Sequence, residues 1–132
     1  MNRIPAVVTA VESVDGITIV SFQTEGTPMR MMALEMAERV AVGMGVILGV
    51  RASGIALATS LGGNLSISNR LDVTVASVTN GELLSSVKVR FGSEVMESII
   101  TRESSLRMAL QPGDRVTALI KSSDLSILEL QG

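Results

Sequence analysis

Two copies of one pattern occupy the whole 132-residue chain, and this repeat constrains the fold more than any other feature. Asn2-Arg3-Ile4 matches Asn69-Arg70-Leu71, and Val8 and Val11 match Val75 and Val78 at the same offset. Further matches at slightly longer offsets are Phe22 and Glu25 with Phe91 and Glu94, and Gly43, Val46, Arg51 and Ser53 with Gly113, Val116, Lys121 and Ser123. We therefore expect two domains, residues 1–62 and 63–132, joined through the turn-rich segment 60–64.

The second copy predicts five short strands and one helical turn. Residues 71–78 and 87–91 alternate apolar and polar side chains on either side of Asn80-Gly81, which is typical of a hairpin. Residues 95–100 form a third strand, after which Thr101 can cap a helical turn that ends before Pro112. Residues 116–120 and 125–130 are the last two strands. The chain is predicted to be all-β, with two OB-type Greek-key five-stranded barrels, each with a short helical turn.

The missing residue types exclude most catalytic chemistry. The chain has no Cys, His, Trp or Tyr, so thiolate and imidazole metal sites, cysteine nucleophiles and a Ser-His-Asp triad are absent. Five methionines are close together in the first copy: Met29, Met31, Met32, Met36 and Met44. Thioether ligands favour Cu(I). Because no Cys or His accompanies these methionines, we interpret them as core or interface residues. The sequence predicts a binding module rather than an enzyme, with no metal bound directly by side chains.

Charge and hydropathy exclude two classes of partner. With 11 basic and 13 acidic residues, a pI near 5.1 and two Phe as the only aromatic residues, the chain lacks the basic surface and stacking platforms of a nucleic-acid binder. The longest uncharged apolar stretch, residues 40–50, contains three glycines and is shorter than the ~20 residues of a membrane helix. No secretory signal is expected at the N-terminus. We predict a cytoplasmic protein that binds neither nucleic acid nor membrane.

Four motifs of the second copy resemble one known family. They are residues 66–71 (SISNRL), 100–104 (ITRES), 110–114 (LQPGD) and 118–123 (ALIKSS). In order and spacing they are similar to the Mop or TOBE domain of molbindins, and the whole chain resembles the two-domain (di-Mop) molbindins. The resemblance implies OB-type barrels, an intracellular protein that binds molybdate or tungstate, and assembly as a homotrimer whose sites draw ligand groups from neighbouring subunits.

The same resemblance implies a set of oxyanion-binding residues. The family opens each domain with Ser-Ala-Arg-Asn, and Ser68 stands here at the arginine position. Matched residue by residue, the second copy gives Ser66, Ser68, Asn69, Thr101, Ser104, Lys121 and Ser122. In the first copy Met31 and Leu34 stand opposite Thr101 and Ser104, which leaves Arg51, Ala52 and Ser53 as candidates.

The chemistry of these side chains suits the ligand that the resemblance implies. Molybdate is a tetrahedral dianion without a proton at neutral pH, so a selective site offers donors and few acceptors. Lys121 and the hydroxyl of Ser122 follow an apolar strand, and Thr101 precedes a helical turn whose free N–H groups favour an anion. Small barrels are marginally stable alone, which favours burial of apolar surface between chains.

Two other functions stay open at this point. One is an oxyanion-sensing regulatory module, similar to the Mop pair of molybdate-responsive regulators or the TOBE segment of transporter ATPases. The other is an OB-type nucleic-acid binder, which the charge and the aromatic content disfavour. The first hypothesis is molybdate or tungstate binding for storage or homeostasis.

Overall fold

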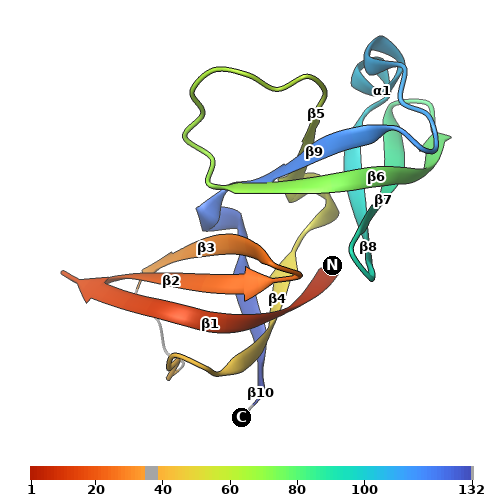
Figure 1. Cartoon of the computed structure of the whole chain (residues 1–132). Coiled ribbons are helices and arrows are strands. Elements are labelled where there is room, and N and C mark those ends of the chain that lie inside the picture. The colour runs from red at the N-terminus through yellow and green to blue at the C-terminus, as the bar shows by residue number, and fades with distance from the viewer. Residues whose placement is uncertain (35–38, 132) are drawn as a thin grey trace.

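The computed structural model describes residues 1–34 and 39–131, which fold into two five-stranded, curled antiparallel sheets (Figure 1). The first sheet has the order β10-β4-β1-β2-β3 and the second the order β5-β9-β6-β7-β8. The strands are β1 (Asn2–Val14), β2 (Ile17–Thr24), β3 (Thr27–Leu34), β4 (Gly45–Val50), β5 (Ile55–Ala58), β6 (Asn69–Asn80), β7 (Leu84–Phe91), β8 (Glu94–Thr101), β9 (Arg115–Ile120) and β10 (Ser126–Gln131). The predicted all-β class and OB-type architecture are confirmed.

Helical structure is short. The α-helix α1 (Arg102–Met108) follows β8, and two 3-10 turns, η1 (Ala52–Gly54) and η2 (Ser122–Asp124), follow β4 and β9. Thr101 is the N-cap of α1, as predicted, and Ala109 ends the helix in the left-handed conformation. The helical turn expected in the first half falls between β3 and β4, where residues 35–38 lie outside the described residues and residues 39–44 form no helix. No helix in the described part of the chain has the length and hydropathy to cross a membrane.

The repeat is more regular than the sequence matches indicated. In β1 and β2 Val8 pairs with Phe22, and in β6 and β7 Val75 pairs with Val89, with a bulge just after Val8 and after Val75. Phe22 is therefore equivalent to Val89, and its match with Phe91 is wrong. The offset between the copies is constant through the first three strands and larger from β4 and β9 onward, because the second half has additional residues around α1.

Each sheet is completed by a strand from the other half of the chain. β5 is the last strand of the first copy but pairs with β9, from Ile55 opposite Ile120 to Ala58 opposite Thr117. β10 ends the second copy but pairs with β4 in the first sheet. Gly49 on β4 makes room for this strand, because a Cβ atom there would lie 2.6 Å from Cγ of Leu128. The domain boundary between residues 62 and 63 stays a prediction. Two strand pairs, β5 with β9 and β10 with β4, join residues on opposite sides of it.

Alternation of side chains builds one core between the sheets. The inward faces of β1, β2, β6 and β7 carry buried, mainly apolar residues. The outward faces of β6 and β7 are mainly polar, whereas those of β1 and β2 also expose valines and isoleucines. Met29, Met31 and Met96 are buried in this core, and Met44 packs against it. Met36 lies outside the described residues. Met29, Met31 and Met44 are thus core residues, as interpreted from the sequence, whereas Met32 is 46% exposed and is not part of the core.

Two asparagines at equivalent positions tie the halves together. The amide of Asn69 accepts a hydrogen bond from the backbone N–H of Arg30 (2.7 Å) and donates to its carbonyl (2.9 Å). The amide of Asn2 makes the same pair of bonds with Glu97, each 2.8 Å long. Arg30 and Glu97 themselves occupy equivalent positions of β3 and β8. The first residue of the first strand in each half thus fixes the third strand of the other half.

Candidate functional site

Ser68 and Lys121 lie side by side at one end of the second sheet. Asn69 and Ile120 are opposite each other in the β6–β9 register, and Ile120 is also opposite Ile55 on β5. The residues just beyond this row, Ser68 and Lys121, therefore leave their strands at the same edge. The predicted cation and one predicted hydroxyl are brought together by the register of β6 and β9.

The segment that contains Ser66 is held by Arg70. Its guanidinium donates from Nε to the carbonyl of Ile67 and from Nη2 to the carbonyl of Leu65, each at 3.0 Å. These two carbonyls flank Ser66, so the hydrogen bonds fix the course of the backbone before β6. Ser66 and Ser68 are both exposed. Their hydroxyls stand at the surface beside the end of β9.

The two 3-10 turns present the basic candidates in the same way. Arg51 is the N-cap of η1 with φ −68 and ψ 146, and Lys121 is the N-cap of η2 with φ −65 and ψ 144. Neither side chain forms a salt bridge within the described residues. The first N–H groups of such turns also lack partners inside the turn. Each turn offers one free cation followed by donors, from Ala52 and Ser53 in η1 and from Ser122 in η2.

A cleft of about 450 Å³ lies where these turns meet. Its polar lining consists of Arg51, Ser53, Ser123, Asp124 and Ser126. Gly54 and Asp124 are close, since a Cβ atom on Gly54 would lie 3.7 Å from that of Asp124. The carboxylate of Asp124 repels an anion, so the cleft is more favourable for one on the Arg51 side.

Thr101 and Ser104 form a second group of donors. The hydroxyl of Thr101 accepts a hydrogen bond from the backbone N–H of Ser104 (3.2 Å) and donates to its hydroxyl (2.9 Å). The carbonyl of Leu83 accepts from the N–H of Arg102, which holds the β6–β7 turn against the start of α1. Leu83 and Leu84 are 82% and 56% exposed. The hydroxyl pair therefore stands beside apolar surface that no described residue covers.

A single chain keeps the two groups apart. α1 precedes β9 and η2 follows it, so the groups lie toward opposite ends of this strand, as Figure 1 shows. A six-residue strand spans about 20 Å. Within one chain, Thr101 and Ser104 therefore lie toward the α1 end of β9, and Lys121 and Ser122 lie toward its η2 end.

Asn69 has a structural role within the chain. It is 0% exposed, and its amide oxygen and nitrogen are both bonded to the backbone of Arg30. The sequence placed it in the site because it belongs to the opening motif. Its amide oxygen and one of its two N–H groups are thus committed to the third strand of the other half.

The first half lacks the hydroxyl at the end of its third strand. β3 and β8 have the same length and begin at the equivalent residues Thr27 and Glu94, which makes Leu34 the equivalent of Thr101. The sequence matches placed Met31 opposite Thr101, and this was wrong. The strand bounds make Met31 the equivalent of Ser98. Leu34 is 76% exposed. The equivalent of Ser104 lies in residues 35–38, outside the described residues.

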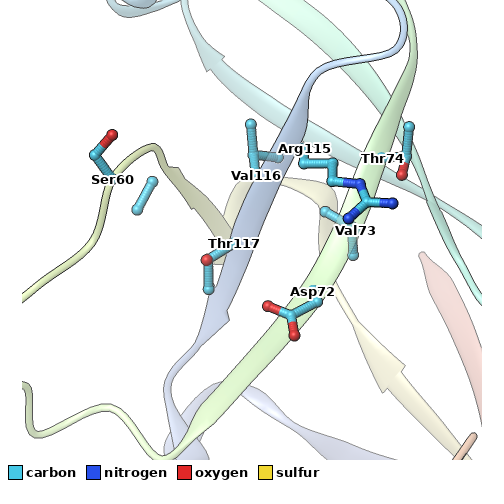
Figure 2. Close-up of a pocket in the computed structure, with 8 residues that line it drawn as sticks. Ser60, Asp72, Val73, Thr74, Arg115, Val116 and Thr117 are labelled. Carbon is cyan, nitrogen blue, oxygen red and sulfur yellow. The ribbon is translucent and has the colours of Figure 1, made fainter.

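One cavity on the second sheet contains none of the predicted site residues. It has a volume of about 530 Å³ and runs over β5, β9 and β6 (Figure 2). Asp72 faces Thr117 across the β6–β9 pair, and Thr74 faces Arg115. Because the lining holds a carboxylate as well as a guanidinium, it offers an acceptor and a donor to the same ligand. An oxyanion without a proton cannot donate to the carboxylate, so this cavity offers it little binding energy.

Comparisons with known proteins agree with the fold. Residues 65–127 match the family model of the TOBE domain. The cytoplasmic molybdate-binding protein ModG, in a form with molybdate bound, superposes with a TM-score of 0.89 at 24% identity over 96% of this chain and 94% of that chain. A molybdate-binding protein from Sporomusa ovata is 29% identical over 50% of this chain and 98% of that chain, with a TM-score of 0.49. No curated protein sequence matches the chain.

The family match covers the segment that carries all four sequence motifs. The ModG likeness shows that this arrangement of two sheets is a known fold. The resemblance inferred from the motifs is confirmed for residues 65–127, which match the TOBE domain model.

Proposed function

We propose that the protein binds molybdate, and tungstate as a close analogue, for storage or homeostasis in the cytoplasm. The observation that carries the proposal is the pair of basic N-cap residues, Arg51 and Lys121, each free of salt bridges within the described residues and followed by serines. The TOBE match over residues 65–127 supports the same ligand class, and ModG, which shares the fold, is described as a cytoplasmic molybdate-binding protein.

The complete site of this proposal lies between copies of the chain. Lys121, Ser122 and Ser66 of one copy meet Thr101 and Ser104 of another. The distance of these groups along β9 supports a shared site, and so does the uncovered apolar surface of Leu83 and Leu84 beside Thr101. A neighbouring copy covers these leucines and excludes water from the anion, which strengthens every charged hydrogen bond there. The proposed assembly is a homotrimer.

Titration calorimetry with molybdate, tungstate, sulfate and phosphate tests the function. Molybdate and tungstate are expected to bind with similar affinity, because they have the same charge and nearly the same size. Hydrogen phosphate is expected to bind far more weakly, since its proton meets no acceptor among hydroxyls and ammonium groups. Sulfate is expected to be rejected by its smaller size. If phosphate displaces molybdate at equal concentration, the donor-rich site is refuted.

Association and binding are expected to be linked. If the site needs two copies, molybdate favours the assembled state by mass action. Light scattering on a dilution series, with and without molybdate, is expected to show a trimer that persists to lower protein concentration when the ligand is present. A monomer that binds molybdate with full affinity contradicts the shared site while leaving the ligand itself supported.

A further inference from the structure

A groove of about 300 Å³ crosses the junction of the two halves, between the outer faces of β2 and β3 and the residues before β6. We call it the Arg30 groove, and its polar side chains are Thr9, Ser21, Gln23, Arg30, Ser68 and Asn69. They supply three hydroxyls, two carboxamides and a guanidinium, and no acidic residue is among its described lining. The groove is therefore rich in donors and carries a positive charge.

Arg30 is held in place and its charge is free. Both polar groups of its backbone are bonded to the amide of Asn69, which is 0% exposed. Its guanidinium forms no salt bridge with the residues that the structure describes. A fixed backbone with an uncommitted charge is a favourable arrangement for an anion, because less conformational freedom is lost on binding.

The second half shows the same position without a free charge. Ser21 is opposite Arg30 in the β2–β3 register, and the equivalent pair in β7 and β8 is Lys88 opposite Glu97. Opposite charges on directly facing residues neutralise each other. The equivalent of Thr9 there is Ala76, which has no hydroxyl. The first half thus carries an unpaired guanidinium and hydroxyls where the second half is charge-balanced.

We propose that the Arg30 groove is a second oxyanion site, which takes a tetrahedral dianion and uses Arg30 as its charged ligand. Ser21 faces Arg30 across the strands, and Ser68 approaches from the other half because Asn69 holds β3 beside it. The groove shares Ser68 and Asn69 with the residues that the sequence predicts for oxyanion binding, but Thr101, Ser104, Lys121 and Ser122 do not line it. This inference does not depend on the proposed function.

Backbone amide shifts measured by NMR on the full chain distinguish the two sites. Molybdate and sulfate are each titrated into the wild-type protein and into Arg30→Gln. The expected result is a saturable shift of the amides of Ser21, Arg30 and Ser68 in the wild-type protein. In Arg30→Gln the affinity derived from these shifts is expected to be about tenfold lower. Arg90→Gln is the control, since it removes the same charge from β7 outside the groove and is expected to leave these shifts unchanged.

Ser21→Asp provides an independent variant if Arg30→Gln does not fold. The new carboxylate faces Arg30 and reproduces the neutral pair of the second half, so it is expected to abolish the shifts in the groove. Shifts at residues 101–104 and 121–122 report the proposed molybdate site separately. The inference is overturned if neither anion shifts the groove amides of the wild-type protein, or if the two variants leave those shifts unaltered.

Discussion

Replacing Asn69 with Leu is expected to lower the free energy of unfolding by about 2 to 6 kcal/mol. The substitution leaves the N–H and the carbonyl of Arg30 without partners beside a fully buried side chain. Each unsatisfied buried group costs about 1 to 3 kcal/mol. Since a domain is stable by about 5 to 15 kcal/mol, this change takes a large share of the total.

Urea unfolding followed by circular dichroism measures this effect. Asn2→Leu is the informative comparison, because Asn2 makes the same two bonds to Glu97 but is only partly buried, so water can replace them at lower cost. Asn64→Ala is the control on an exposed linker residue and is expected to change stability by less than about 0.5 kcal/mol. If Asn69→Leu and Asn64→Ala lower the free energy of unfolding equally, the two hydrogen bonds between Asn69 and Arg30 contribute nothing to stability.

Replacing Lys121 with Met is expected to weaken molybdate binding by about 1.5 to 3 kcal/mol, the range of a hydrogen bond to a charged group. Methionine keeps most of the apolar stem but removes the ammonium. Lys121 forms no salt bridge with the described residues, so its loss leaves no partner unpaired and the fold is expected to persist. Calorimetric titration gives the affinity, and urea unfolding of the same sample confirms the fold.

Lys88→Met is the matched control for this experiment. It removes the same group from the same half of the chain, but Lys88 lies opposite Glu97 on the outer face of β7. Its affinity for molybdate is expected to equal that of the wild type. If Lys121→Met binds as tightly as the control, the anion is bound elsewhere in the protein.

Local signals in the sequence predicted the strands and the helix cap well. The alternation around Lys88 and Arg90 corresponds to β7, and the apolar run 116–120 lies within β9. Thr101 was expected to cap a helix and does so. These features depend on side chains within a few residues of one another, so the sequence carries them directly.

Strand partners could not be predicted in the same way. β5 and β10 have the composition of strands, but nothing in such short strands states which sheet each one joins. Phe22 and Phe91 were matched because both are aromatic, whereas the register is set by the bulges after Val8 and Val75. A bulge arises from backbone pairing and requires no particular residue type, so the sequence does not show where it occurs.

The site residues stay a prediction, and the sequence does not give their arrangement. The motifs place Thr101, Ser104 and Lys121 at the ends of elements, and none of the three is fully buried. Their separation along β9 depends on the direction of that strand, which the sequence does not state. Arg30 was missed altogether, since its place beside Ser68 follows from the amide of Asn69 reaching into the other half.

The exchange of β5 and β10 governs when the protein can fold during its synthesis. β4 ends at Val50, but its partner β10 ends at Gln131, so the ribosome needs about 4 to 16 s between them at roughly 5 to 20 residues per second. Throughout that interval the edge of β4 is an unpaired template. If β10 of another copy fills this edge first, the first sheet is completed between two chains, so the order in which chains meet decides which copy completes it.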